Sequence, residues 1–344
     1  MESTELRYIE LKNQICRQIY EGICRDGEKI PSERQLSEDF NVSRITVRKA
    51  LELLEEEGLI LREVGNGTTV TLKNHGNETA MDVIALAAPS RNPFFARFIA
   101  EFQRCAWEQD ALLLYVEAPE GTTLEDCLYR LYTKNIRNAV VWPDDRGVDQ
   151  EKLLRLRSIG MNLVFFDTDA CGPFADSVFV DNVDAVRTLL EREEKHRQYL
   201  YVGWDNLAIG NIRKREEAFR KLCPQGQVCH VPWRRNRQMA RTAAEEIRKM
   251  AEEMSDGLIV CGTGELAQQT AESLWETSGQ ESSRVRLAAI DDFEGSGRFP
   301  VSVYNQDLGV AAREIYECLE RQREEKSGWR ARIIPVKGTY IPGR

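Results

Sequence analysis

The chain has 344 residues, of which 42% are hydrophobic, and a formal net charge of −9. This length is too great for one small domain, and it predicts two or three structural units with a sizeable packed core. No apolar run approaches about 18 residues and the N-terminal residues lack the form of a signal peptide, so we expect a cytoplasmic protein without a membrane span.

The cysteines and histidines do not suggest a metal site or a redox site. The nine cysteines are scattered without a C-x-x-C pair, and the three histidines lie far apart. We interpret the cysteines as reduced thiols, most of them in the core, as is typical of cytoplasmic proteins. Because neither residue type has the spacing of metal ligands, we expect neither a metal nor a cofactor.

The first 40 residues predict two helices. Residues 8–25 have the apolar spacing of a first helix. The isoleucines on or near its expected buried face are Ile9, Ile15, Ile19 and Ile23. A second, shorter helix is expected to begin after Ser32, a good N-cap residue, and to bury Leu36 and Phe40.

The run NVSRITVRKALELLEEEGLI (41–60) predicts a third helix, capped by Ser43 and ended by Gly58. Its apolar stripe consists of Val47, Ala50, Leu51 and Leu54. Arg44 and Arg48 lie off this stripe in the first turns, whereas the last turn is acidic. This order of charges opposes the helix dipole, so helix stability does not explain it. A solvated basic face or a contact with an anionic partner would explain it.

A hairpin follows the third helix. Residues 59–64 and 68–72 are β-rich, and Gly65-Asn66-Gly67 between them is a strong turn signal. The short connection 41–43 can set the second and third helices at a steep angle. Two helices, a short turn, a third helix and a hairpin are the order of a winged helix-turn-helix domain of the α+β class.

The runs IPSERQLSEDFNVSRITVRKALELLEEEGLI and VGNGTTV resemble the DNA-binding domain of GntR-type transcriptional regulators over residues 6–72. The resemblance implies that the third helix enters the major groove of DNA and that the wing tip approaches the minor groove. It implies the DNA-binding residues Arg34, Ser43, Arg44, Thr46, Arg48, Lys49, Gly65, Asn66 and Gly67. Arginine suits this role because its guanidinium fork can pair with guanine or clamp a phosphate.

The expected DNA-binding domain is nevertheless acidic as a whole. Residues 1–72 contain ten lysines and arginines against fourteen aspartates and glutamates. Positive charge must then be confined to the recognition surface, so non-specific DNA binding should be weak and steeply dependent on salt. Tight binding to random-sequence DNA at physiological salt would contradict this expectation.

The rest of the chain predicts an α/β architecture. Residues 73–80 are polar and are interpreted as a linker, so the expected organisation is a domain over 1–72 and an effector domain over 81–344. Apolar strand-like runs alternate with helical patterns such as 94–109 and 123–135, which favours parallel sheets. The strand-like runs are 81–88, 111–117, 138–142, 162–167, 177–181, 198–204, 227–231, 257–262 and 286–291. Polar residues follow several of these runs, where ligands bind in such sheets.

This region resembles lac-repressor-type effector domains, which share the periplasmic sugar-binding fold (type I). The runs that carry the resemblance are VIALAAPSRNPFFARFIAEF, NLVFFDTDA, ADSVFVDNVDA, RKREEAFRKL and RLAAIDDFEGS, within residues 82–342. It implies two α/β subdomains with a ligand in the cleft between them. It implies the ligand-binding residues Asn92, Phe94, Phe95, Asp167, Arg213, Arg215, Trp233 and Asp291. Carboxylates, arginine and a flat aromatic ring suit a polyhydroxyl ligand.

Several of these assignments have alternatives. The ligand-binding arginine could be Arg213 or Arg215, because both lie in the same loop-to-helix run. The phenylalanines could be core residues, Trp233 a surface or interface aromatic, and the aspartates helix caps. Asp181 and Asn182 are expected to serve a cap or turn. Gly264 stands where many relatives have an acidic residue, and Ala289 where glycine is usual, which leaves the identity of the ligand open.

Together these patterns predict a ligand-responsive transcription regulator, a repressor of sugar-use genes that binds an inverted-repeat operator as a homodimer. A small carbohydrate is expected to close the cleft and change the geometry of the paired DNA-binding domains.

The alternatives are a regulator with a non-sugar effector, such as a nucleoside or another small polar metabolite, and one whose effector domain binds no ligand. An enzyme is disfavoured because the α/β region lacks a G-x-S-x-G motif, a P-loop and a usable histidine pair.

Overall fold

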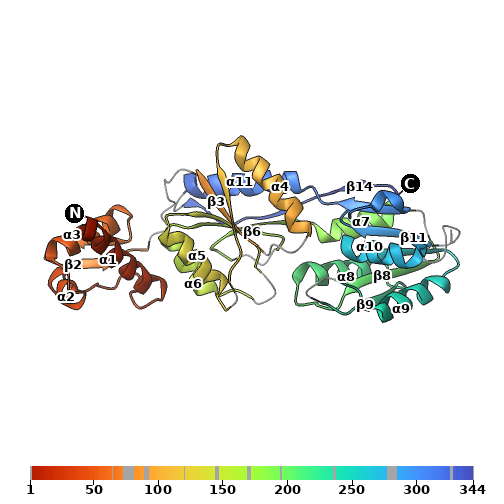
Figure 1. The fold of residues 1–344 in the computed structure, drawn as a ribbon, viewed down its shortest axis with the longest axis horizontal. Helices are drawn as coiled ribbons and strands as arrows, with labels where there is room; N and C mark the ends of the chain where they lie inside the picture. Colours follow the sequence, from red (N-terminus) through yellow and green to blue (C-terminus); the bar gives the residue numbers. More distant parts are fainter. Residues whose placement is uncertain are drawn as a thin grey trace. The chain divides into compact units, whose positions relative to one another are not determined.

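The computed structural model describes residues 2–63, 65–72, 81–88, 93–119, 121–143, 147–168, 172–193, 196–234, 238–276, 285–325 and 328–343 (Figure 1). The chain forms two compact units. Unit 1 comprises residues 1–177 and 312–333, and unit 2 comprises residues 178–311 and 334–344. The chain therefore passes between the units three times. The expected linker over 73–80 lies outside the described residues.

The N-terminal part of unit 1 is a winged helix, as predicted. Its elements are α1 (Glu2–Tyr20), α2 (Glu33–Asp39), α3 (Arg44–Glu56), β1 (Ile60–Glu63) and β2 (Gly67–Val70). The two strands are antiparallel, and the Glu63–Gly67 pair closes the hairpin at the turn. Residues 27–30 extend this small sheet, since Ile30 N donates a hydrogen bond to Thr68 O at 3.0 Å.

The buried face of α1 differs from the predicted one. Its buried residues are Leu11, Ile15, Cys16, Ile19 and Tyr20. The assignments of Ile9 and Ile23 to this face were wrong, because their side chains are 42% and 68% exposed. The helix also ends at Tyr20 rather than near residue 25. Gly22 adopts a φ of +77° there, and Ile23 N donates to Gln18 O at 2.9 Å, which closes the helix in a left-handed cap.

The starts of α2 and α3 follow the predicted capping. The Ser32 side chain accepts a hydrogen bond from Gln35 N, and the Gln35 side chain accepts one from Ser32 N, which makes a capping box. Ser43 caps α3 through Thr46 N at 3.1 Å. The predicted stripe of α3 is confirmed, since Val47, Ala50, Leu51 and Leu54 are all buried. Gly58 follows the C-cap of α3 and adopts a φ of +69°.

The rest of unit 1 is built on a six-stranded sheet with the order β13-β7-β6-β5-β3-β4, of which β7 and β13 run past the unit boundaries at residues 177 and 333. The pairs β3–β4, β3–β5 and β5–β6 are parallel. Helices cover both faces of this sheet (Figure 1). Phe98 of α4 stacks on Phe166 of β6, whereas the neighbouring Phe165 packs on the side of α5 and α6. The elements are β3 (Val83–Ala87), α4 (Pro93–Glu108), β4 (Leu112–Val116), α5 (Leu124–Thr133), β5 (Asn138–Val141), α6 (Gln150–Ser158), β6 (Asn162–Phe166), β7 (Asp176–Val180), α11 (Leu308–Glu325) and β13 (Ile333–Val336).

Unit 2 is built on a second six-stranded sheet, with the order β14-β12-β11-β10-β8-β9. All of its neighbouring pairs are parallel except β12–β14, which is antiparallel. Its elements are α7 (Asn182–Arg192), β8 (Gln198–Trp204), α8 (Gly210–Leu222), β9 (Gln227–Val231), α9 (Arg241–Glu252), β10 (Gly257–Cys261), α10 (Gly264–Ala271), η1 (Glu272–Glu276), β11 (Val285–Ile290), η2 (Ser296–Arg298), β12 (Val301–Asn305) and β14 (Thr339–Ile341). The predicted two-subdomain α/β class is confirmed.

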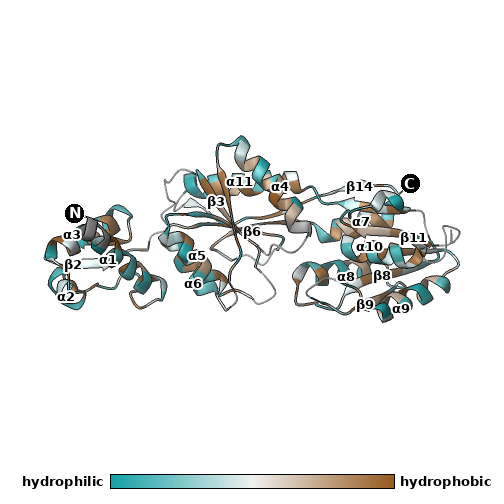
Figure 2. Ribbon diagram, viewed as in Figure 1, coloured by the Kyte–Doolittle hydropathy of each residue, from teal (hydrophilic) through white to brown (hydrophobic). Residues whose placement is uncertain are grey.

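Hydropathy explains why both sheets are buried. The strands are dominated by hydrophobic residues, and the helices that cover them are hydrophilic on their outer sides (Figure 2). Strands that are buried on both faces show continuous apolar runs, such as NLVFF in β6 and GLIVC in β10. None of the described helices is long and apolar enough to span a lipid bilayer.

Candidate functional site

The first turns of α3 present an exposed basic surface. Arg44, Ile45, Arg48 and Lys49 are all exposed, and Ile45 retains 77% of its accessible surface. Glu33 of α2 pairs with two arginines beside this surface. Its carboxylate lies 3.4 Å from Arg48 Nη2 and 2.7 Å from Arg62 Nη2. Both arginines are thereby oriented while Arg48 stays open to solvent.

Other predicted DNA-binding residues have structural contacts at the start of the helices. Thr46 is only 4% exposed, and its hydroxyl lies 2.8 Å from the Ser43 hydroxyl, so both belong to the cap of α3. Arg34 is exposed on α2, where its Nε lies 3.8 Å from Glu38 Oε1. Lys49 Nζ lies 4.9 Å from the centre of the Tyr8 ring.

The wing tip depends on two glycines in the left-handed region. Gly65 and Gly67 have φ values of +82° and +94°. A Cβ at either position would meet no atom within 4 Å, so backbone conformation rather than space requires glycine. Between them, Asn66 accepts a hydrogen bond from Lys29 Nζ at 2.9 Å and donates one to Glu63 at 2.5 Å.

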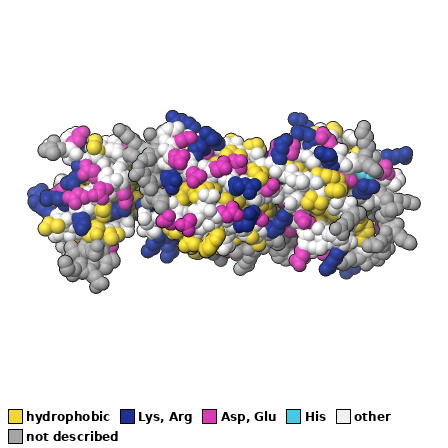
Figure 3. All heavy atoms as spheres, turned by 90° about the horizontal axis from the view of Figure 1, so that it is seen from above, with side chains coloured by type: hydrophobic (Ala, Val, Ile, Leu, Met, Phe, Trp, Pro, Cys, Tyr) yellow, Lys and Arg dark blue, Asp and Glu magenta, His cyan; other side chains and the backbone are white. Residues whose placement is uncertain are grey.

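Two acidic residues near the C-terminal end of α3 pair with basic residues outside this helix. Glu57 at the far end of this helix pairs with Lys12 of α1, and Glu55 lies 3.9 Å from Arg62. On the face seen in Figure 3, acidic and basic side chains are interspersed rather than gathered into one large basic field. The basic surface is therefore local, as the acidic composition of the domain requires.

A second constellation lies at the carboxyl ends of the strands of unit 2. Arg215 of α8 is 5% exposed, and it donates from Nε to Asn182 Oδ1 at 2.7 Å and from Nη1 to Gly262 O at 2.8 Å. Arg213 instead points outward to Glu217, 3.7 Å away. Of the two arginines, the structure thus places Arg215 against the strand ends.

Asn182 belongs to this constellation, which sequence reasoning missed. We expected Asp181 and Asn182 to serve a cap or turn, and Asp181 does cap α7 through Asp184 N at 2.9 Å. Asn182, however, is 2% exposed, and it bridges Arg215 to Asn211, whose Oδ1 lies 2.8 Å from Asn182 Nδ2. No feature of the sequence distinguishes the capping role of Asp181 from the bridging role of Asn182.

An aromatic pair lies at the ends of β8 and β9. Trp204 ends β8 and is buried, and the half-buried Trp233 stands nearly perpendicular to it, with ring centroids 5.6 Å apart and planes at 88°. Trp233 N donates to Asp205 Oδ1 at 2.7 Å, which fixes the loop after β9. The structure therefore brings Trp233 to the same end of the sheet as Arg215.

The end of β11 adds a carboxylate. Asp291 has a φ of +76°, and its Oδ2 accepts a hydrogen bond from Gln306 Nε2 at 2.6 Å. Gly264 stands at the position where many relatives were expected to have an acidic residue. It approaches this loop so closely that a Cβ would lie 2.8 Å from Asp292 O. Glycine at position 264 therefore lets α10 start directly against the Asp291–Asp292 backbone.

Burial keeps the neighbouring titratable groups neutral. Burial raises the pKa of Tyr201, whose ring lies beside Gly262, well above its usual value, although Arg215 opposes this effect. Burial also raises the pKa of Cys261, the last residue of β10, to about 12. Near neutral pH, neither Tyr201 nor Cys261 therefore contributes charge at this end of the sheet.

The unit 1 residues expected at the ligand are less completely placed. Asp167 directly follows β6 with a φ of +60°. Asn92 and the side chains of Phe94 and Phe95 lie outside the described residues, and only the backbone of the two phenylalanines is placed, at the start of α4. These assignments remain predictions.

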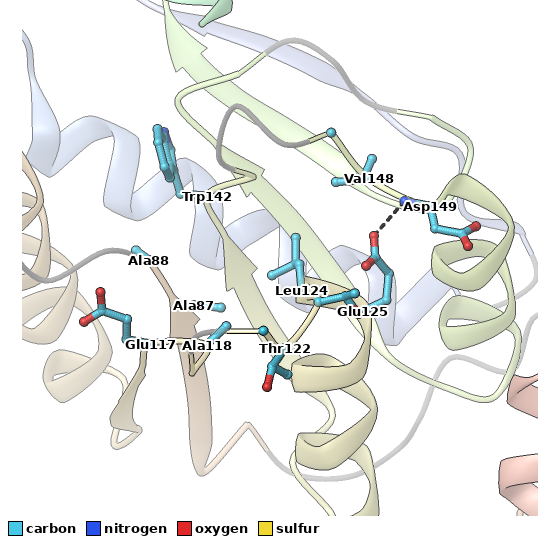
Figure 4. A pocket seen from close by; sticks show the side chains of 13 residues that line it. Ala87, Ala88, Glu117, Ala118, Thr122, Leu124, Glu125, Trp142, Val148 and Asp149 are labelled. Carbon is cyan, nitrogen blue, oxygen red and sulfur yellow. Dashed lines mark hydrogen bonds between the residues drawn. The ribbon is translucent and has the colours of Figure 1, made fainter. Parts of the chain in front are cut away.

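Unit 1 contains a cavity of about 660 Å³ that the sequence did not predict. It opens at the carboxyl ends of β3, β4 and β5, where Trp142, Glu117, the first turn of α5 and the residues just before α6 surround it (Figure 4). Glu125 Oε1 accepts a hydrogen bond from Asp149 N at 2.7 Å and so joins the two helix starts. Among the described residues, no group of three or more histidine, cysteine, aspartate or glutamate side chains is arranged to hold a metal ion.

Comparisons with known proteins agree with this division. Residues 7–70 match the family described as bacterial regulatory proteins, gntR family. Over 70 residues the chain is 41% identical to the arabinose metabolism transcriptional repressor of Geobacillus stearothermophilus. This matched segment makes up 20% of this chain and 19% of that protein. Matches of this kind span between 19% and 28% of the length of the first curated relatives.

Solved structures match the remainder of the chain in fold. The Cra transcriptional dual regulator from Pseudomonas putida, in complex with fructose 1-phosphate, has a TM-score of 0.63 at 17% identity, covering 77% of this chain and all of that one. The lac repressor dimer bound to operator and the anti-inducer ONPF has a TM-score of 0.58 at 13% identity, covering 76% and 93%. Residues 7–70 are thus a gntR-family helix-turn-helix domain, and the α/β region that follows has the fold of LacI-type regulators.

Proposed function

We propose that the chain is a cytoplasmic transcription regulator that binds an inverted-repeat operator as a homodimer and represses sugar-use genes until a small carbohydrate binds. The observation that carries the proposal is the exposed pair Arg44 and Arg48 at the start of α3, beside a glycine wing. A helix of this kind fits the major groove, where arginine pairs with guanine O6 and N7.

The end of the unit 2 sheet supports a polyhydroxyl effector. Arg215, Asp291 and Asp205 offer charged hydrogen-bonding groups, and the half-buried ring of Trp233 offers a flat apolar surface. Sugars are recognised by this combination of groups. The relatives include a repressor of arabinose metabolism and a regulator in complex with fructose 1-phosphate.

The same residues do not support an enzyme. Arg215 is engaged by Asn182 and Gly262, and Asp291 by Gln306, which makes them fixed binding groups rather than a nucleophile with an adjacent base. The second candidate is a regulator with a non-sugar effector, because the cavity of unit 1 is lined by the carboxylates of Glu117, Glu125 and Asp149 and would favour a ligand with an ammonium group.

A thermal-shift screen tests the effector. The intact protein is heated with pentoses, hexoses, uronic acids, disaccharides and sugar phosphates. A ligand present at a hundred times its dissociation constant should stabilise the binding state by about 2.7 kcal/mol. We expect a hit whose shift is lost in Arg215→Ala and Asp291→Asn but is kept in Arg213→Ala, the exposed neighbour.

The outcomes separate the two candidates. An unchanged shift in Arg215→Ala would refute the unit 2 site. If no sugar produces a shift, the carbohydrate proposal fails, and nucleosides and amines become the next compounds to test. Asp291→Asn keeps the size of the side chain, so it distinguishes a lost contact from a damaged fold.

A surface of unit 1 fits the proposed dimer. Trp107 of α4 is 72% exposed, and Leu112 and Leu114 of the edge strand β4 are 59% and 38% exposed. Exposed apolar groups beside an open strand edge are typical of an interface. We expect Trp107→Glu to convert a dimer into monomers in sedimentation at micromolar concentration. Leu222→Glu, on unit 2 and with Leu222 40% exposed, should leave the dimer intact, and equal dissociation by both variants would contradict this assignment.

A further inference from the structure

Helix α1 of the winged helix packs against α5 and α6 of the same unit. The ring of Tyr20, the last residue of α1, stacks on the ring of Tyr129, with centroids 4.4 Å apart and planes at 15°. The Tyr20 hydroxyl donates a hydrogen bond to Asp126 Oδ1 at 3.1 Å. An offset stack with a hydrogen bond at its rim fixes both the distance and the rotation of two helices.

Two cations close around this stack. The Arg17 guanidinium lies 5.5 Å from the centre of the Tyr20 ring and 5.2 Å from that of Tyr129. Lys152 of α6 lies 5.3 Å from the Tyr20 ring and 3.5 Å from Asp126 Oδ1. Cation–π contacts from α1 and α6, together with an ion pair between α5 and α6, therefore hold the stack.

A second set of contacts lies one to two turns away. Tyr129 donates from its hydroxyl to Asn13 O at 3.2 Å, and Cys16 Sγ lies 3.8 Å from the Tyr132 hydroxyl. Cys16 and Tyr20 are fully buried, and Tyr132 is nearly so. The core of the winged helix is thus continuous with the core under α5 and α6.

We infer that the surface formed by Asp126, Tyr129, Tyr132 and Lys152, here called the docking surface, holds the winged helix in place and thereby sets the spacing between operator half-sites. The inference rests on the proposed function. None of these four residues belongs to the basic surface of α3 or to the wing, so they act on DNA selectivity only through the position of the domain that α1 carries.

The docking surface limits how far each DNA-binding domain can reach. Eight residues, the length of 73–80, can extend by no more than about 28 Å. Two domains joined only through such segments could serve several half-site separations, since each added base pair moves a site by about 3.4 Å and turns it by about 35°. A domain that is docked on a buried aromatic surface has lost this freedom, so only one separation fits both domains of a dimer.

The experiment uses the full chain and a duplex that the wild-type protein selects from a random-sequence library. Affinities are measured for that duplex, for duplexes with one or two base pairs inserted between the half-sites, and for a single half-site. Wild type should lose at least about tenfold in affinity with two inserted base pairs. Asp126→Lys and Tyr129→Ala should lose less than about threefold, while binding to the half-site stays within about twofold of wild type.

Glu324→Lys makes the same change of charge at an exposed position of α11 and should keep the wild-type preference for spacing. The inference is overturned if the Asp126 and Tyr129 variants discriminate spacings as wild type does, or if wild type has no preference. Failure to select any duplex would instead refute the proposed function. Because Asp126 is partly exposed, its variant tests the surface even if Tyr129→Ala does not fold.

Discussion

Asp176→Ala should lower the free energy of unfolding by about 3–5 kcal/mol, the largest stability effect that we expect from a single substitution in this chain. Asp176 is fully buried at the start of β7. Its Oδ1 accepts hydrogen bonds from Arg321 Nη2 at 2.5 Å and Arg332 N at 2.8 Å. Its Oδ2 accepts from Gln322 Nε2 at 2.7 Å and Trp329 Nε1 at 3.0 Å. Alanine would leave four donors without their acceptor.

The effect should be large because this carboxylate joins distant parts of unit 1. Gln322 also donates to Leu163 O at 2.8 Å and accepts from Leu163 N at 3.0 Å, so the network ties α11 to both β6 and β7. Buried donors that lose a charged acceptor cost more than exposed ones, because water cannot replace it. A loss of this size is a large share of the stability of a typical domain.

Urea unfolding followed by circular dichroism measures the change. Glu325→Ala is the matched control, because Glu325 pairs with the same Arg321 at 3.2 Å but is 39% exposed. An exposed pair contributes less than about 1 kcal/mol, so this variant should unfold near the wild-type midpoint. If Asp176→Ala shifted the midpoint no further than Glu325→Ala does, the network would have no special role in stability.

The sequence predicted the elements whose signals are local. In α3, Ser43 caps the start of the helix, the predicted apolar stripe is buried, and Gly58 follows its end. These three predictions are confirmed. Helix α1 was predicted less well, because its buried face is chosen by tertiary contacts. Tyr20 and Cys16 are buried against α5, whereas Ile23 lies beyond the helix end. Hydrophobicity alone favoured the isoleucines.

The three strands that sequence analysis missed are all near the C-terminus. β12, β13 and β14 contain five, four and three residues. The last two flank a tight connection, where Gly338 approaches Asn305 O so closely that a Cβ would lie 2.4 Å away. Such strands are defined by the sheets that they join rather than by a long apolar run of their own.

The candidate sites show the same limit. The choice between Arg213 and Arg215 could not be made from two positions on one helix, but the partners of Arg215, Asn182 and Gly262, come from two other segments of the chain. The cavity of unit 1 is likewise made by three loops that are separate in sequence. Its walls include Glu125 and Asp149, at the same helix starts as Asp126 and Lys152 of the docking surface. Both sites are therefore products of topology.

Arg44→Ala should weaken binding to the selected operator by about 5- to 150-fold, which corresponds to about 1–3 kcal/mol. Arg44 is exposed at the first position of α3, and no ion pair to it is present among the described residues. Its guanidinium is therefore available without the loss of a protein contact, in contrast to Arg48, which lies 3.4 Å from Glu33.

Arg44→Lys separates the two ways in which Arg44 can act on DNA. Lysine keeps the positive charge but lacks the fork that pairs with one guanine. If Arg44 reads a base, both variants should lose affinity, and selection with either variant should relax at one base pair of each half-site. If it clamps a phosphate, Arg44→Lys should bind nearly as wild type does, and Arg44→Ala should weaken all sequences alike and reduce the salt dependence by about one counterion. Undiminished affinity in Arg44→Ala, measured by fluorescence anisotropy at physiological salt, would remove Arg44 from the recognition surface, and the proposed role of the first turn of α3 would then depend on Arg48 and Lys49.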